Sequence, residues 1–323
     1  MRKSLLALAM LWAASAAAQP AGAPALTVGV APSIDNTLMI VAVKRGFLAK
    51  EGLNAQLQLF DSSPGALQGV VAGRADVTNN TEPPHLAARA RGGKIVQVMT
   101  GYLTGKQNAL VVNSDSISKP ADFVGKAVGV QRGSGAHYHL AWFFQRNKIP
   151  ADKVSVKFMD VPDQIAALAR NDIQAFFSWE PYVSKAGETV PKARIYSRNA
   201  DDGLVFSGNV VMREEIVKTR RDVAEKTVRG LIAAADWIMA NPLEAAKVAN
   251  EVIKGPSAEV VSQQIQNLSW PGDFRKKIHE QEVGIAEWGI GMGLFPATDA
   301  RKLVDELIDP SIIKAVAPSR TDF

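Results

Sequence analysis

Residues 164–181 read QIAALARNDIQAFFSWEP, and this stretch places a helix, a turn and a strand in direct succession. Residues 164–170 carry apolar residues at the spacing of one helix face. Asn171-Asp172 is a typical turn pair, and Ile173–Phe177 is an apolar run with the length of a buried strand. The closing Glu-Pro predicts that another helix begins directly after the strand.

The same order of elements occurs 98 residues earlier, where residues 66–83 read ALQGVVAGRADVTNNTEP. Leu26–Val30 reads as a further strand ahead of both units. Strands that alternate with helices indicate an α/β fold with largely parallel sheets. We therefore expect two analogous lobes, each presenting the carboxyl end of a strand followed by a new helix. A chance match of a common helix–turn–strand pattern is the alternative.

Two apolar strands are expected to join the lobes, Ala109–Val112 on the way out and Val210–Met212 on the way back. This gives a first lobe of residues 25–112 and 207–323 and a second lobe of residues 113–206. The C-terminal part of the chain has the three–four apolar spacing of helices in Val223–Asn241, Leu243–Ile253 and Ala258–Leu268.

Residues 1–18 have the pattern of a secretory signal peptide, with a basic start, the apolar run Leu5–Ala14 and three alanines before Gln19. The chain has no cysteine, so we expect neither a disulfide nor a lipid-bearing cysteine after cleavage. No later stretch is long and apolar enough for a membrane helix. The sequence therefore predicts a free protein in the periplasm, without insertion into the membrane.

The composition is that of an ordinary globular protein, with 323 residues, 47% hydrophobic and 21% charged. The net charge is +5, and it falls to about +3 without Arg2 and Lys3. The lysines and arginines are spread along the chain and form no basic patch interleaved with aromatic residues. This pattern argues against a nucleic-acid partner.

Residues 128–139, VGVQRGSGAHYH, lead from a strand into a helix through a glycine-rich turn. The turn matches neither a P-loop, nor the dinucleotide fingerprint, nor a nucleophile elbow. His137 and His139 point to different sides of a helix, so we expect no metal site and no cofactor. Ser134 and His137 are close enough for local contact, but their spacing is no specific sign of serine hydrolysis.

The turn is better suited to an anion, because helix N-termini offer free N–H groups and a positive dipole end. We expect the backbone N–H groups of Gly133 to Gly135 to bind it. Ser134 would cap the helix or donate its hydroxyl, and Arg132 would add a positive charge. The alternative is an ordinary capped helix with no ligand.

The other candidate ligand-binding residues lie where strands end, which is where open α/β sheets bind their ligands. Trp179 could wall the carbon atoms of a small ligand, or pack under its own loop. Glu180 and Glu82 could meet a ligand, or simply begin a helix. Neutral polar groups of the first lobe complete the set: Asn36, Asn80 and Thr81.

The chain resembles the periplasmic solute-binding proteins of ABC importers for taurine, aliphatic sulfonates and nitrate. The resemblance runs the length of the mature chain, and its motifs are Gly46-Phe47-Leu48, Gly73-Arg74-Ala75-Asp76-Val77, Thr81-Glu82-Pro83-Pro84, residues 118–126 (SKPADFVGK), residues 128–134 (VGVQRGS) and Trp179-Glu180-Pro181-Tyr182. Their order and spacing carry the resemblance together.

This resemblance implies a type 2 periplasmic-binding fold, with two α/β lobes, two crossovers and the ligand in the cleft between them. It implies a monomeric binding protein, not an enzyme, that delivers a small anionic solute to a membrane permease. Gly133-Ser134 and His137-Tyr138 resemble the segment that holds the anionic head group. A pyrimidine such as a thiamin precursor, or an aromatic acid, is the alternative solute, and a secreted enzyme on the same fold is the remaining one.

Overall fold

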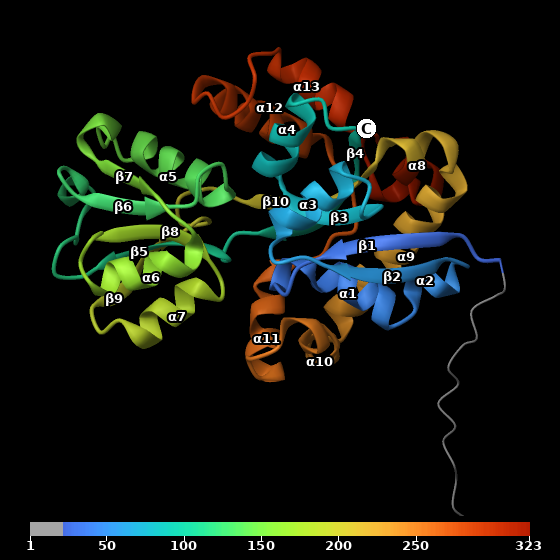
Figure 1. Ribbon diagram of the computed structural model, residues 1–323, viewed down its shortest axis with the longest axis horizontal. Coiled ribbons are helices and arrows are strands. Elements are labelled where there is room, and N and C mark those ends of the chain that lie inside the picture. Colours follow the sequence, from blue (N-terminus) through green and yellow to red (C-terminus); the bar gives the residue numbers. More distant parts are fainter. Residues whose placement is uncertain (1–21) are drawn as a thin grey trace, which may run out of the picture.

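The computed structural model describes residues 22–323 and divides them into two lobes, each built around its own β-sheet (Figure 1). The stretch read as a signal peptide lies outside the described residues. The first lobe contains the N-terminal and C-terminal parts of the described chain, and the second lobe, green in Figure 1, contains the middle. The two-lobed α/β architecture expected from the sequence is confirmed.

The first lobe holds a six-stranded sheet in the order β11-β4-β10-β3-β1-β2. Its strands are β1 (Ala25–Val30), β2 (Asn54–Leu59), β3 (Val77–Thr81), β4 (Ile95–Thr104), β10 (Phe206–Arg213) and β11 (Leu268–Ser269). Its helices are η1 (Ile34–Asn36), α1 (Thr37–Lys44), α2 (Phe47–Lys50), α3 (Ser63–Val71), α4 (Glu82–Ala90), α8 (Glu214–Thr219), α9 (Arg221–Ala240), α10 (Pro242–Ile253), α11 (Ala258–Gln266), α12 (Lys276–Gly291), α13 (Ala300–Leu307), α14 (Ser311–Val316) and η4 (Pro318–Arg320).

The second lobe holds a five-stranded sheet in the order β7-β6-β8-β5-β9. Its strands are β5 (Asn108–Asn113), β6 (Ala127–Val130), β7 (Ser155–Phe158), β8 (Ala175–Trp179) and β9 (Ala193–Arg198). Its helices are η2 (Pro120–Phe123), α5 (Gly135–Arg146), η3 (Ala151–Lys153), α6 (Val161–Ala169) and α7 (Tyr182–Thr189). The repeated sequence pattern corresponds to α3–β3 in the first lobe and α6–β8 in the second.

Parallel pairing is confined to three strands of each sheet, so the sheets are mixed. In the first lobe β1 pairs in parallel with β2 and β3, and in the second β6 pairs in parallel with β7 and β8. The other pairs are antiparallel, because β4 leaves the first lobe and β10 returns beside it in the opposite direction. The carboxyl ends of the parallel strands therefore define one ligand-binding edge in each lobe.

One strand lies in a different sheet from the one that the sequence suggested. Ala109–Val112 was expected to run out of the first lobe, but it lies in β5, which pairs with β8 and β9 inside the second sheet. The chain crosses between the sheets in two short segments, residues 105–107 and 199–205. The amide of Asn199 donates to the carbonyl of Thr104 at 2.7 Å, which ties the two crossing segments together. The exact lobe boundaries proposed from the sequence stay a prediction.

Residues 35–50 have the apolar spacing of one helix, with Leu38, Val41, Ala42 and Leu48, but in the structure they are divided into η1, α1 and α2. Gly46 has a φ of 73°, a left-handed conformation that ends α1 and lets the chain start a new turn at Phe47. The long C-terminal helices agree with their apolar spacing to within two residues at each end. No helix within residues 22–323 combines the length and the apolar character needed to cross a membrane.

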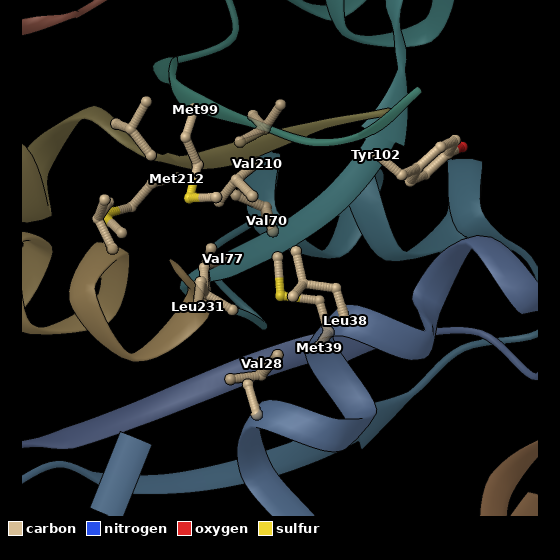
Figure 2. Close-up of a cluster of buried hydrophobic side chains, with 14 of the residues drawn as sticks. Val28, Leu38, Met39, Val70, Val77, Met99, Tyr102, Val210, Met212 and Leu231 are labelled. Atoms are coloured by element: carbon tan, nitrogen blue, oxygen red, sulfur yellow. The ribbon is translucent and has the colours of Figure 1, made fainter. Parts of the chain in front are cut away.

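The first lobe is held by one continuous apolar core on both faces of its sheet, part of which Figure 2 shows. Val28 and Val77 from the parallel strands belong to the same apolar cluster as Met99 from β4 and Val210 from β10. The second lobe has a separate apolar cluster on each face of its sheet, under α5 on one side and under α6 and α7 on the other. Two independent cores let each lobe keep its shape if the crossing segments bend.

Candidate functional site

The first turn of α5 is arranged as an anion-binding helix start. Ser134 is the N-cap, and its hydroxyl accepts from the N–H of His137 at 3.2 Å and donates to the carbonyl of Gln131 at 2.8 Å. Within residues 22–323, the N–H groups of Gly135 and Ala136 have no hydrogen-bond partner, and both residues are buried. Such buried, unpaired N–H groups are rare and costly, so a ligand at this point would satisfy them.

The set of N–H groups differs from the expected set of Gly133, Ser134 and Gly135. The N–H of Gly133 donates to Nδ1 of His137 at 3.2 Å, and the N–H of Ser134 reaches the carbonyl of Gln131 at 3.4 Å. Of the three expected N–H groups, only that of Gly135 has no partner within the described residues. The N–H of Ala136, which was not expected, is unpaired as well. The left-handed φ of 74° at Gly133 turns its N–H back toward the helix and explains this local pairing.

His137 uses its imidazole inside the protein. Its ring packs against Phe158 at 5.1 Å and against Trp288 of α12 at 5.2 Å, centroid to centroid. Burial, together with the nearby charge of Arg132, lowers the pKa of His137 to about 4, so the ring is neutral at pH 7. A neutral ring can accept the proton of Gly133 N–H. Because Trp288 belongs to the first lobe, His137 also lies at the contact between the lobes.

Arg132 is exposed, and its guanidinium lies 5.2 Å from the centre of the Phe158 ring. It forms no ion pair with any acid in residues 22–323. Arg132 therefore contributes an exposed positive charge beside the turn rather than a contact inside it.

Trp179 and Asn108 extend the site along the second sheet. They are directly paired in the register of β8 and β5, so their side chains lie on the same face. Trp179 packs against the apolar cluster on the α5 face. A Cβ built on Gly135 would lie 3.6 Å from Nδ2 of Asn108, so this amide is next to the free N–H groups. Asn108 is a donor that the sequence pattern did not reveal.

Glu180 is already satisfied by protein groups. One carboxylate oxygen accepts from Nη2 of Arg198 at 3.2 Å, and the other accepts from the N–H of Ser184 in the first turn of α7 at 3.0 Å. Its role as the acid that begins a helix is the one that the structure supports.

Glu82 is fully buried, and its Oε1 accepts three hydrogen bonds. The donors are the N–H and the hydroxyl of Ser207, at 2.7 and 2.6 Å, and the amide of Gln281 at 2.8 Å. Burial raises the pKa of Glu82 to about 8, and the nearby Glu282 carboxyl adds to the shift, while the Ser207 hydrogen bonds oppose it. Glu82 is therefore mainly protonated at pH 7. Thr81, the N-cap of α4, makes no capping hydrogen bond with its side chain.

The first-lobe edge is a dense polar cluster. Asn80 donates to the carbonyl of Ser63 at 2.6 Å, and Asn36 donates to the hydroxyl of Ser63 at 2.8 Å. The Ser63 hydroxyl in turn donates to Asp35 at 2.8 Å. The sequence pattern missed Asp35 and Ser63, although each lies in the first helical element after a strand, which was the signal that could have identified them.

No group of three His, Asp or Glu side chains in residues 22–323 has the arrangement of a metal site. What the two edges offer is hydrogen bonding: unpaired N–H groups and an aromatic side chain on the second lobe, and amides, hydroxyls and a carboxylate on the first. Such an arrangement can bind a small polar solute. Ser134 and His137 do not form a nucleophile–base pair, because the Ser134 hydroxyl donates to Gln131 and Nδ1 of His137 accepts from the N–H of Gly133.

The curated proteins that are similar in sequence to this chain include binding proteins. The chain is 24% identical over 259 residues to a putative binding protein of Brucella abortus, covering 79% of each chain. It is 28% identical over 197 residues to the taurine-binding periplasmic protein of Escherichia coli, covering 61% of each. These relatives confirm the resemblance that the sequence motifs indicated.

Comparison with solved structures confirms the fold. The alkanesulfonate-binding protein SsuA from Xanthomonas axonopodis pv. citri matches with a TM-score of 0.74 at 19% identity, covering 91% of this chain and 99% of that one. The desulfurization enzyme DSZB matches with a TM-score of 0.69 at 17% identity, covering 92% and 99%. The family model described as NMT1/THI5 like matches residues 33–245, well over half of the sequence, and the chain therefore belongs to the NMT1/THI5-like family.

Proposed function

We propose that this protein is the periplasmic solute-binding component of an ABC importer. It would capture a small organic anion of the aliphatic sulfonate or taurine class between its lobes and deliver it, as a monomer, to a membrane permease. The family, the taurine-binding relative and the alkanesulfonate-binding structural neighbour all support this proposal.

The observation that carries the proposal is the pair of buried, unpaired N–H groups at Gly135 and Ala136. They stand at the positive end of the 12-residue helix α5, where backbone dipoles favour negative charge. Asn108 beside them adds a neutral donor, and Trp179 adds an apolar surface for the carbon atoms of a solute. Arg132 beside the turn favours the approach of an anion.

The expected strength of such a site is sufficient for solute capture. A micromolar dissociation constant corresponds to about −8 kcal/mol. Hydrogen bonds to a charged group contribute roughly 1.5–3 kcal/mol each, so four or five of them could supply this free energy after the costs of ordering. No covalent step is needed.

The N–H group of Gly135 can be tested without disturbing the helix. Proline is favoured at this first helical position, and the preceding Ser134 already has the extended ψ of 169° that proline requires. Gly135→Pro removes the N–H, whereas Gly135→Ala adds a Cβ and keeps it. We expect Gly135→Pro to bind sulfonate at least tenfold more weakly than Gly135→Ala in calorimetry. Equal affinities would show that the N–H does not meet the anion.

The solute class is tested by titrating the unmodified protein with taurine, ethanesulfonate, nitrate, benzoate and a neutral pyrimidine. We expect the sulfonates to bind with micromolar constants and the pyrimidine not to bind. Binding of the pyrimidine alone would reject the anionic solute. Native mass spectrometry of freshly purified protein would identify a solute carried through purification.

Catalysis on the same fold is the competing function, since one structural neighbour is a desulfurization enzyme. The hydrogen bonds of Ser134 and His137 argue against a Ser–His pair in this chain. We expect taurine and ethanesulfonate to remain unchanged after long incubation with stoichiometric protein, as measured by proton NMR. Release of sulfite or sulfate would overturn the binding-only function.

A further inference from the structure

Asp35 and Asn36, in η1 directly after β1, form what we name the acceptor pair of the first lobe. The amide nitrogen of Asn36 faces three acceptors: the hydroxyls of Ser33 at 3.0 Å and Ser63 at 2.8 Å, and Oδ2 of Asp35 at 3.2 Å. Because the carboxylate oxygen of Asp35 can only accept, the amide atom of Asn36 that faces it must be the nitrogen. The oxygen of Asn36 therefore points the other way, where it is buried and has no partner within residues 22–323.

The Asp35 carboxylate is held in the same way. Its Oδ2 accepts from Ser63 at 2.8 Å as well as from Asn36. The amide of Asn79 in β3 donates to the Asp35 carbonyl at 2.9 Å and fixes the backbone. No protein donor in residues 22–323 contacts Oδ1. Asp35 is only 9% exposed and Asn36 is fully buried, so the acceptor pair offers one buried amide oxygen and one carboxylate oxygen that no protein group occupies.

The negative charge of Asp35 would make the acceptor pair selective for a cationic group. Asp35 has no ion pair with a lysine, arginine or histidine of the described chain; its donors are all neutral. Burial first, and then the charges of Asp35 and Glu82, raise the pKa of Tyr102 well above its ordinary value of 10. Figure 2 shows the Tyr102 hydroxyl directed away from the apolar core. Tyr102 lies near the end of β4, where the chain crosses to the second lobe, so this group of residues borders the interlobe junction.

The two edges of the site therefore have opposite polarity. Within residues 22–323 the second lobe offers unpaired donors at Gly135 and Ala136, and the first lobe offers the buried, unpaired oxygen of Asn36 and the Oδ1 of Asp35, which no protein donor contacts. A buried carboxylate without a cationic partner costs free energy, and a ligand cation would relieve that cost. We propose that the solute is zwitterionic: its anionic group lies on the start of α5 and its primary ammonium group lies on the acceptor pair.

This inference rests on the proposed function, and the deciding experiment separates the two. Calorimetry compares taurine, which has both groups, with ethanesulfonate, which lacks the ammonium. A third compound, 3-aminopropanoate, keeps the ammonium and replaces the sulfonate by a carboxylate. We expect taurine to bind at least tenfold more tightly than ethanesulfonate. Equal binding of these two would overturn the zwitterion and leave the sulfonate function intact; failure of all three would overturn the proposed function itself.

Asp35→Asn tests the residue directly. The new amide oxygen can accept from Ser63 and Asn36 as Oδ2 does, so its nitrogen would take the place of Oδ1 and turn an acceptor into a donor. We expect the ratio of taurine to ethanesulfonate affinity to fall by tenfold or more. Asp61→Asn, an exposed acid in the neighbouring loop, is the matched control and should keep the ratio. A retained ratio in Asp35→Asn, in a variant shown by circular dichroism to be folded, would overturn the assignment, and the wild-type comparison decides alone if the variant does not fold.

Discussion

The two Glu-Pro corners of the molecule have the same position in their lobes and opposite electrostatics. Glu82 follows β3 and Glu180 follows β8, 98 residues later, and both side chains are almost fully buried. Glu82 receives hydrogen bonds only from the neutral groups of Ser207 and Gln281. Glu180 is paired with Arg198 and caps the first turn of α7. The charge state of a buried acid is therefore set by its partners and not by its local sequence.

Glu82 and Glu180 also connect different parts of the molecule. Glu82 joins α4 to β10 through Ser207 and to α12 through Gln281, so it connects the strand that follows the second crossing with a helix that contacts the second lobe. Glu180 binds only groups of its own lobe. Both carboxylate oxygens of Glu180 accept hydrogen bonds from the protein, whereas Oε2 of Glu82 has no partner within residues 22–323 but belongs to an acid that is mainly protonated at pH 7.

The largest effect is expected from Glu82→Ala. The substitution leaves the buried donors of Ser207 and Gln281 without an acceptor and opens a cavity between α4, β10 and α12. We expect a loss of about 3–5 kcal/mol in the free energy of unfolding. Urea denaturation at pH 5, where the carboxyl is protonated, measures this loss. A change below about 1 kcal/mol would mean that Glu82 does not bind these donors.

A pH dependence of stability follows from the same residue. The pKa of Glu82 is about 8 in the folded protein against an ordinary value of 4.5. Between these values the folded state keeps a proton that the unfolded chain has released. The free energy of unfolding should therefore decrease as the pH rises from 4.5 to 8, by up to about 1.4 kcal/mol per pH unit.

Glu82→Gln isolates this contribution, because glutamine imitates the protonated acid and keeps the acceptor oxygen. Glu282, Tyr102 and Tyr138 interact electrostatically with Glu82, and all three are present in both proteins. The difference between wild type and Glu82→Gln cancels them. We expect the variant to become the more stable protein as the pH rises above 6. A constant difference from pH 5 to 8 would place the pKa of Glu82 near its ordinary value.

The sequence was informative where structure depends on neighbours in the chain. The α3–β3 and α6–β8 units follow from apolar spacing. The cap of α5 follows from Ser134, whose hydroxyl accepts from the N–H of His137 three positions later. It was uninformative where distant residues decide. The strand Asn108–Asn113 is apolar in either sheet, and only its pairing with β8 and β9 assigns it. The partners of Glu82 lie 125 and 199 residues away, so no local pattern could predict its protonation.

The smallest effect is expected at the other corner, from Glu180→Ala. The substitution removes the acceptor for the Ser184 N–H and the partner of Arg198, but Arg198 is partly exposed, so water can replace the lost ion pair. A helix cap contributes about 1 kcal/mol and such an ion pair less, so we expect a loss of about 1–2 kcal/mol in urea denaturation at pH 7. Glu180→Gln keeps an acceptor for Ser184 and should recover most of this loss. A loss as large as that of Glu82→Ala would show that the two corners are energetically equivalent, and that the neutral network around Glu82 is not what distinguishes the first lobe.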